Sequence, residues 1–257
     1  MKIATWNVNS LRVRLLHVLD WIKTEQPDIL ALQETKTEDK NFPIEDIENA
    51  GYKVIYSGQK TYNGVAILSR ITGSDIVTDI PDLDDHQRRV LCATIGGVRV
   101  LNVYIPNGEA VGSEKYSYKL GWLEKLTAYV EAQCAIYPRL ILLGDFNIAP
   151  EPRDVHDPAL WEGRVLFSEP ERAAFRGLVD LGLYDTFRLF EQQPNHFSWW
   201  DYRMAAFRRN MGVRIDHVLA SAALRDVCVS CHIDKTPRTW ERPSDHTPVV
   251  TVFDFPI

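Results

Sequence analysis

The sequence is dominated by short apolar runs separated by turn-forming residues, which limits the chain to a fold rich in strands. Strands are predicted at residues 2–8, 28–33, 52–57, 64–69, 90–95, 98–105, 139–143, 196–200, 214–220 and 247–255. Two of these runs flank Gly96-Gly97, and glycine at both positions predicts the tight turn of a β-hairpin. Several runs are apolar throughout, so we expect strands that are covered on both faces.

Three stretches between these runs repeat their apolar residues at helical spacing. They lie at residues 11–22, at residues 113–133, and from the capping box of residues 168–171 to Gly182. Helices outside two sheets that pack face to face would bury both faces of the apolar strands. We therefore expect an α/β fold in which residues 1–257 form one domain.

Charge and composition exclude several classes of protein. The formal net charge of −6 and the pI near 5.7 argue against a protein that binds nucleic acid over its whole surface. No apolar run approaches the ~20 residues of a membrane helix, and the first residues do not resemble a secretory signal. The four cysteines are sparse, and Cys228 and Cys231 are expected as structural residues of a strand. We expect a cytoplasmic protein with no membrane partner.

Polar side chains recur at or just beyond the carboxyl ends of the predicted strands, where α/β proteins commonly build sites. A single Asp or Asn in such a place is more often a turn former than a catalyst, but here the pattern recurs along the chain. The residues are Asn7, Asn9, Glu34, Tyr104, Asn107, Asp145, Asn147, Asp216, His217, Asp245 and His246. Together they predict a shared site.

This set is rich in carboxylates and has no cluster of cysteines and histidines at zinc spacing. Oxygen ligands suit Mg²⁺ or Mn²⁺. Two carboxylates ~4 Å apart repel each other by roughly 4 kcal/mol at an effective dielectric constant of ~20, and a bound cation removes most of that cost. Phosphate is the usual substrate partner of such a cation. We therefore expect Mg²⁺ or Mn²⁺ as the cofactor.

The segment Asp145-Phe146-Asn147 carries information about geometry. In an extended chain, residues i and i+2 point to one side, so Asp145 and Asn147 would face one cavity while Phe146 points into the core. Gly144 would let the chain depart sharply from the strand. An Asp/Asn turn without chemistry is the alternative, and the residues alone leave it open.

Motifs along nearly the whole chain resemble those of a known family. They are Trp6-Asn7-Val8-Asn9-Ser10, Leu32-Gln33-Glu34-Thr35-Lys36, Tyr62-Asn63-Gly64-Val65-Ala66, Asn102-Val103-Tyr104-Ile105-Pro106-Asn107-Gly108, Gly144-Asp145-Phe146-Asn147, Arg214-Ile215-Asp216-His217 and Ser244-Asp245-His246. With them the sequence resembles the exonuclease III family of DNA-repair nucleases. The resemblance implies a four-layer αββα sandwich, with two mixed, mostly antiparallel sheets and helices outside. It also implies metal-dependent hydrolysis of DNA phosphodiesters: 3′-to-5′ exonuclease action, incision at abasic sites and cleaning of 3′ ends.

The resemblance also implies roles for single residues. Glu34 would bind the metal ion together with Asn7 and Asp245. Asp145 would activate the attacking water or protonate the leaving oxygen. Asn147 would hydrogen-bond the nucleophile or the phosphate.

Five further residues are implied as phosphate contacts or as their partners. His246, oriented by Asp216, would bind the phosphate and stabilise developing charge. Tyr104 and Asn107 would contact the scissile phosphate, and Arg89 would contact the DNA backbone.

The aromatic and arginine-rich segment at residues 197–214 would enter the minor groove beside the site. Arg208 and Arg209 are expected to contact phosphates. Trp200 is a candidate substrate contact, although a core position is an equal alternative. The implied partner is double-stranded DNA with 3′ ends, nicks or abasic sites, bound by a monomer.

Two rival functions remain. A phosphoesterase of the same superfamily with a non-DNA substrate would lack the combination of the Tyr104/Asn107 loop and the segment at residues 199–214. It would share Glu34, Asp145, Asn147, Asp245 and His246. A catalytically silent binding module would gain nothing from carboxylates clustered near phosphate.

Overall fold

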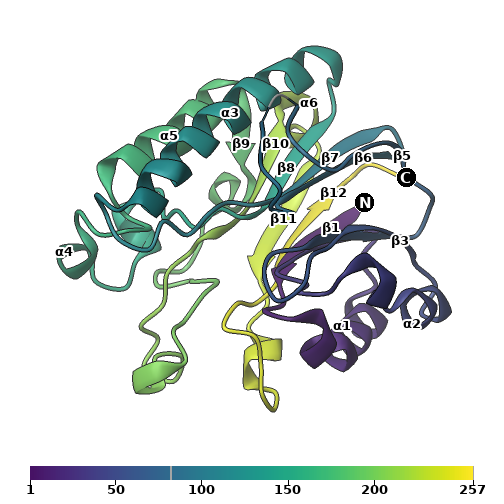
Figure 1. The fold of residues 1–257 in the computed structure, drawn as a ribbon, viewed down its shortest axis with the longest axis horizontal. Coiled ribbons are helices and arrows are strands. Elements are labelled where there is room, and N and C mark those ends of the chain that lie inside the picture. Colours follow the sequence, from purple (N-terminus) through teal and green to yellow (C-terminus); the bar gives the residue numbers. More distant parts are fainter. Residues whose placement is uncertain (82, 257) are drawn as a thin grey trace.

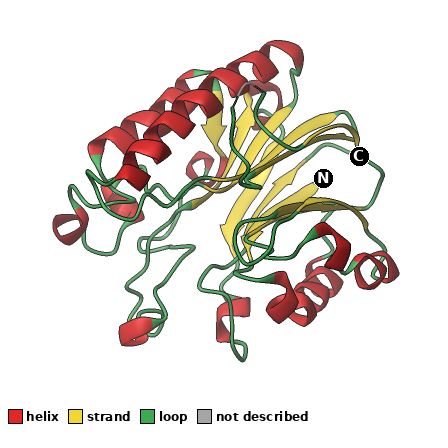
Figure 2. Ribbon diagram, viewed as in Figure 1, coloured by secondary structure: helices red, strands yellow, loops and turns green. Residues whose placement is uncertain are grey.

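The computed structural model describes residues 1–81 and 83–256, which form two six-stranded sheets packed face to face. Helices α1 (Leu11–Glu25) and α2 (Ile44–Asn49) cover the first sheet. Helices α3 (Glu114–Ile136) and α5 (Glu169–Asp180) cover the second (Figure 1). Figure 2 shows the two yellow sheets between these red helices, so the expected four-layer sandwich is confirmed.

The first sheet has the strand order β11-β12-β1-β2-β4-β3. Its strands are β1 (Lys2–Asn7), β2 (Ile29–Gln33), β3 (Lys53–Ser57), β4 (Val65–Ser69), β11 (Cys228–Ile233) and β12 (Val249–Phe253). Only β1 and β2 are parallel neighbours among the pairs of this sheet in the described chain.

The second sheet has the order β5-β6-β7-β8-β10-β9. Its strands are β5 (Ser74–Val77), β6 (Val90–Ile95), β7 (Val98–Tyr104), β8 (Leu140–Asp145), β9 (Leu183–Asp185) and β10 (Asp216–Ser221). Strands β7 and β8 are parallel and the other pairs are antiparallel, so both sheets are mixed and mostly antiparallel.

Strand β8 is an apolar strand that is covered on both of its faces. Leu140 and Leu142 pack beneath α3 and α5, whereas Ile141 and Leu143 pack between the sheets. All four side chains are fully buried, and each contributes roughly 1.5–3 kcal/mol relative to an exposed one. A continuous apolar run is therefore needed here, because neither face of the strand meets water.

Several local predictions are confirmed. Gly96 and Gly97 both have positive φ in the β6–β7 hairpin, and Ser168 and Glu171 form both halves of the capping box of α5. Cys228 and Cys231 lie on β11 with free thiols. Several short elements were not predicted, because they have too few residues to show a clear periodicity. They are strands β5 and β9 and helices α2, α4 (Pro158–Trp161) and α6 (Ala222–Arg225).

The predicted strand at residues 196–200 is wrong. The chain there makes only isolated bridges, from Trp199 to Val213 and from Trp199 to His246. Because Trp199 pairs with two different segments, it connects loops rather than extending a sheet. The loops that carry Arg203–Ala205 and Thr236–Thr239 extend beyond the sheets on the same side, in light green and yellow in Figure 1.

Within the part of the chain that the structure describes, no helix combines the length and the apolar character needed to cross a bilayer.

Candidate active site

Central strands of the first sheet bring three polar residues to one end of the sandwich. Asn7 is the last residue of β1, and the parallel register pairs it with Gln33 of β2. Glu34 follows directly, and His246 lies in the segment that leads into β12, the other neighbour of β1. Residues far apart in the sequence therefore share one edge, because their strands are neighbours.

Central strands of the second sheet contribute in the same way. Asp145 ends β8, where the register pairs it with Tyr104 of β7 on one side and with Asp216 of β10 on the other. The facing strands β1 and β8 lie in contact across the sandwich. The two sheets thus place their polar strand ends opposite each other.

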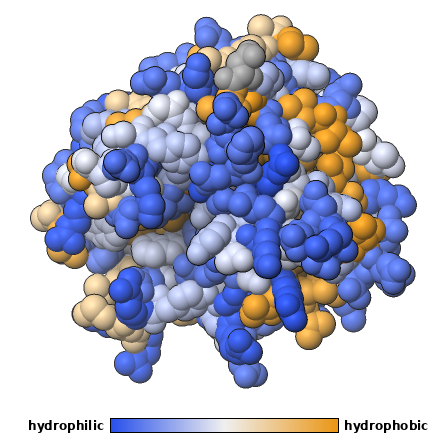
Figure 3. Space-filling view, in the orientation of Figure 1, coloured by the Kyte–Doolittle hydropathy of each residue, from blue (hydrophilic) through white to orange (hydrophobic). Residues whose placement is uncertain are grey.

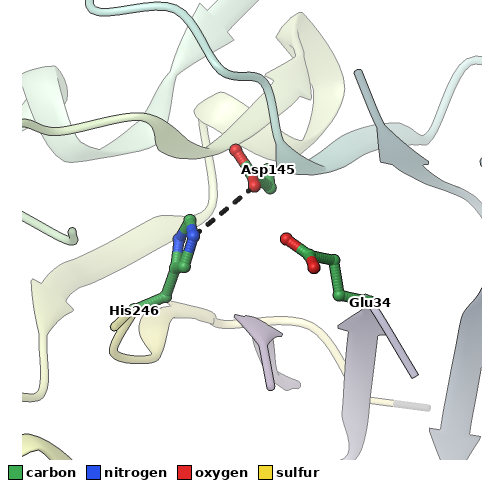
Figure 4. A group of neighbouring side chains, drawn as sticks. All are labelled: Glu34, Asp145 and His246. Atoms are coloured by element: carbon green, nitrogen blue, oxygen red, sulfur yellow. Dashed lines mark ion pairs between the residues drawn. The ribbon is translucent and has the colours of Figure 1, made fainter. Parts of the chain in front are cut away.

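The two halves meet in a compact cluster of Glu34, Asp145 and His246. One ligand atom from each lies within 4.8 Å of the others, and Figure 4 shows the three side chains pointing toward one another. Asn7 Nδ2 donates to Glu34 Oε1 and to Asp145 Oδ2, at 2.9 Å each. Lys36 Nζ lies 2.8 Å from Glu34 Oε2. The two carboxylates therefore share the neutral Asn7 donor, and Glu34 also has the cationic Lys36 beside it.

The surroundings of the buried His246 imidazole favour its cationic form. Its Nδ1–H donates to Asp216 Oδ2 at 2.9 Å, and its Nε2 lies 3.7 Å from Asp145 Oδ2. Burial alone would lower the pKa of this imidazole, but the charges of Asp216 and Asp145 outweigh that effect and raise the pKa to about 10. Ser198 Oγ accepts from the backbone N–H of Asp216, which fixes the carboxylate behind the ring.

Asp145 is almost fully buried, and its environment favours the protonated form. Burial, followed by the nearby Asp216 charge, raises its pKa to about 7, against the opposing effects of His246 and Asn7. The backbone N–H of Asn147 donates to Asp145 Oδ1 at 2.9 Å and fixes the carboxyl group. A carboxyl group of this kind can exchange a proton near neutral pH.

Asp245, the third expected metal ligand, lies beside this cluster and accepts hydrogen bonds from two loops. Its Oδ1 accepts from Asn9 Nδ2 and its Oδ2 from Trp199 Nε1, at 3.0 Å each. Burial would raise its pKa, but the His246 cation and these hydrogen bonds hold the pKa below its ordinary value. Within the described residues it lies outside the 4.8 Å group of Glu34, Asp145 and His246, and its role as a metal ligand stays a prediction.

A second group of predicted residues lines the neighbouring cavity. Asn107 Nδ2 donates to Asn147 Oδ1 at 3.0 Å. The guanidinium of Arg89 lies 4.7 Å from the centre of the Tyr104 ring and donates to the Tyr104 carbonyl at 3.1 Å. Burial, with the nearby carboxylates of Glu34 and Asp145, raises the pKa of Tyr104 well above its ordinary value. Arg89, Tyr104 and Asn107 border a cavity of about 540 Å³.

Backbone conformation at the site differs from the extended chain that we expected. Asn147 has a φ of 50° and Glu34 a φ of 52°, in the left-handed region that asparagine tolerates better than glutamate. Phe146 is nevertheless buried, and Asp145 and Asn147 still lie together. Gly144 allows the close approach of β7 rather than a sharp turn, because a Cβ there would lie 1.9 Å from the Val103 carbonyl oxygen.

The segment at residues 197–214 separates into buried and exposed parts. Trp200 has no exposed surface, and its Nε1 donates to Asn210 Oδ1 at 3.2 Å. It packs with Phe197 and Ala206, which contradicts its assignment as a substrate contact. Arg208 and Arg209 are exposed, as phosphate contacts require.

Two buried cations near the site were not predicted from the sequence. Arg214 lies behind β10 and pairs with Asp154 at 2.6 Å and with Asp185 at 2.8 Å. Lys119 of α3 is fully buried against Glu171. A signal for Lys119 was present, because it falls on the helical stripe that Tyr116, Leu123, Leu126 and Val130 define as buried.

Comparison with known proteins gives consistent matches over the whole chain. Residues 4–246 match the endonuclease/exonuclease/phosphatase family. Exodeoxyribonuclease III of Haemophilus influenzae is 37% identical over 266 residues, covering 98% of this chain and 100% of the relative.

Solved structures also match over nearly the full length of this chain. A 3′ phosphatase from Neisseria, bound to a product DNA hairpin, has a TM-score of 0.98 and 46% identity, with 99% of this chain and 100% of that chain covered. An AP endonuclease from Archaeoglobus fulgidus has a TM-score of 0.96 and 41% identity, with the same coverage of both chains.

Proposed function

The chain belongs to the endonuclease/exonuclease/phosphatase family, and we propose that its strand-end cluster hydrolyses DNA phosphodiesters at 3′ ends and at abasic sites. The protein is an exonuclease III-like DNA-repair nuclease. The observation that carries the proposal is the convergence of Glu34, Asp145 and His246 within 4.8 Å, with Asp216 behind the imidazole. This set offers a cation site, a group that can exchange a proton and a fixed positive charge in one place.

The family is divalent-metal dependent, and the donor set fits a hard cation. We propose Mg²⁺, with Mn²⁺ as a substitute, held by Glu34 and Asn7 beside the Asp145 carboxylate. The Asn7 amide would turn over to ligate, because its Nδ2 faces the carboxylates and its Oδ1 accepts from the Asn9 N–H. Protonated His246 has no free lone pair for a metal. When bound, the cation polarises a phosphate oxygen and offsets the developing negative charge.

The chain's own residues would handle the proton and the charge. Asp145 would accept the proton of the attacking water or deliver one to the leaving oxygen, which suits its raised pKa. His246, kept cationic by Asp216, would direct its Nε2–H at the phosphate. Asn147 would hydrogen-bond the nucleophile or the phosphate from beside Asp145.

Residues beside the cluster would hold the substrate. Tyr104 and Asn107 would contact the scissile phosphate, and Arg89 would contact the backbone along their shared cavity. Arg208 and Arg209 would contact phosphates farther from the reacting one. We propose duplex DNA with 3′ ends, nicks or abasic sites as the substrate.

Three further proposals concern the molecule as a whole. Residues 1–257 would form one domain, since both sheets share an apolar layer between them. The protein would act as a monomer, because helices of the same chain cover the outer faces of the sheets. A cytoplasmic location is supported by four cysteines that all carry free thiols.

The proposed function is tested with two DNA substrates, a duplex with a recessed 3′ end and a duplex with one abasic-site analogue. Each is incubated with Mg²⁺ and with a chelator, and inositol phosphates serve as the non-DNA comparison. We expect cleavage of both DNAs that the chelator abolishes. Release of phosphate from the inositol phosphates with neither DNA cleaved would instead support the non-DNA phosphoesterase.

A further inference from the structure

Lys119 lies directly beneath the two loops that carry Asn107 and Asn147. Its side chain has no exposed surface, and its Nζ donates to the Asn107 carbonyl at 3.1 Å and to the Asn147 carbonyl at 2.7 Å. The third contact of the ammonium is the Glu171 carboxylate. A lysine ammonium has three N–H groups, so all of its donors are used.

Glu171 is equally enclosed and fixes the ammonium from the other side. Its Oε1 also accepts from the Leu166 N–H at 3.0 Å, and its Oε2 accepts from the Ser168 N–H at 3.1 Å. The Ser168 hydroxyl donates to the same Oε2 and lies 2.6 Å from the Tyr116 hydroxyl. Such full hydrogen bonding is what a buried ion pair needs to compensate for the loss of water.

The loops that Lys119 contacts adopt conformations that need support. Asn147 is left-handed, and the Asn107 and Asn147 side chains bond to each other at 3.0 Å. One ammonium therefore holds the main chain of both residues while their side chains hold each other. Gly108 lets the lysine pass, because a Cβ there would lie 3.0 Å from Lys119 Cδ and its φ is 92°.

We propose that Lys119 is a positioning residue for the nuclease reaction: its ammonium sets the distance and orientation of Asn107 and Asn147 relative to Asp145. This inference rests on the proposed function of those two asparagines. Lys119 does not touch the substrate, since it is enclosed behind the loops. Its loss would lower kcat more than DNA affinity, because the reacting groups would be misplaced while the exposed arginines remain.

The test compares the double variant Lys119→Met/Glu171→Gln with the single variant Glu171→Gln. Both remove the buried charge pair, but only the single variant keeps the donors to the two carbonyls. We expect kcat of the double variant to fall by roughly 10²-fold and kcat of Glu171→Gln to fall much less, with KM little changed in both. Cleavage of the recessed duplex, after circular dichroism confirms folding, gives both constants.

Hydrogen exchange provides a second readout, which distinguishes a local displacement of the Asn147 loop from a loss of stability of the whole protein. The Asn147 N–H donates to Asp145 Oδ1, so its exchange should accelerate in the double variant more than that of amides in distant strands. If the double variant does not fold, Lys119→Gln/Glu171→Gln replaces it, since this neutral pair keeps a side-chain hydrogen bond but is too short to reach both carbonyls.

The outcomes separate this inference from the function on which it rests. A wild-type protein that cleaves neither DNA would overturn the proposed function. A wild-type protein that cleaves DNA, together with a folded double variant of unchanged kcat, would overturn the role of Lys119 alone. A kcat that falls equally in both variants would also overturn it, because the carbonyl contacts would then be irrelevant.

Discussion

The floor and the rim of the candidate active site are built in opposite ways. The floor consists of Asp145, Asp216 and His246, each no more than 4% exposed and each hydrogen-bonded to another part of the site. The rim is the loop at residues 201–211, where Met204 is 73% exposed. Figure 3 shows mainly hydrophilic side chains on the parts of the molecule that project at the lower edge.

The difference corresponds to two physical requirements. Charge stabilisation needs fixed groups in a medium of low dielectric constant, which only buried strand ends provide. Phosphate contacts along a duplex act through water and screened charge, and they tolerate mobile, exposed side chains. The rim is anchored at its base, where Arg238 packs against the rings of Trp200, Tyr202 and Phe207 and the Tyr202 hydroxyl donates to the Pro243 carbonyl.

The largest expected effect is at the floor, in Asp145→Asn. The amide cannot take up a proton, so single-turnover cleavage of the recessed duplex should slow by roughly 10²–10⁴-fold. Binding of the same DNA should persist, because the rim is untouched. Asp180→Asn, at an exposed position of α5, is the matched control. Cleavage by Asp145→Asn at the wild-type rate would show that the buried floor is not the part of the site that carries out the reaction.

The next effect is on the free energy of unfolding, which should depend on pH through the buried His217. Burial, followed by the Arg214 charge, lowers the pKa of His217 from 6.5 to about 4, so the unfolded chain takes up a proton at a higher pH than the folded one. The free energy of unfolding should therefore fall by about 3 kcal/mol as the pH decreases from 6.5 to 4.

Denaturant titrations at several pH values measure this dependence. His217→Gln still offers a donor to the Ile148 carbonyl and an acceptor to Arg214 but does not titrate. Its stability should fall less over the same pH interval. Equal slopes for the two proteins would show that His217 contributes nothing to the pH dependence.

A smaller effect is expected for Glu34→Gln, which keeps the shape of the side chain and removes a charged ligand. The Mg²⁺ concentration that gives half-maximal cleavage should rise by at least roughly tenfold. Glu48→Gln, exposed on α2, controls for the loss of one negative charge. An unchanged Mg²⁺ dependence would exclude Glu34 as a ligand and assign the cation to other residues of the site.

The smallest effect is at the rim. Arg208→Gln/Arg209→Gln should reduce the slope of log binding constant against log salt concentration by about one for each lost phosphate contact. DNA affinity should decrease at low salt, while the Mg²⁺ dependence of cleavage stays that of the wild-type protein. Lys125→Gln, exposed on α3, removes a cation elsewhere. A slope equal to wild type would mean that the two arginines do not contact phosphate.

Features that depend on neighbouring residues could be predicted from the sequence, whereas features that depend on residues far apart in the chain could not. The hairpin at Gly96-Gly97 and the capping box at residues 168–171 were predictable, because they depend on neighbouring residues. The burial of Trp200 was not predictable, because it depends on packing with Phe197 and Ala206 and on the nearby Arg238. Lys119 shows the same limit, since a lysine on a helix is normally exposed unless a partner such as Glu171 is present.

By itself, the sequence determined the strand and helix periodicity, the order of the polar motifs and the chemical types of the side chains at the strand ends. Tertiary structure decided which of them meet: Glu34, Asp145 and His246 form one cluster, whereas Asp245 bonds to Asn9 and Trp199 beside it. It also decided that the pKa of Asp145 is raised to about 7 and that of His246 to about 10. Such properties depend on burial and on charges contributed by distant segments, which periodicity and residue type do not encode.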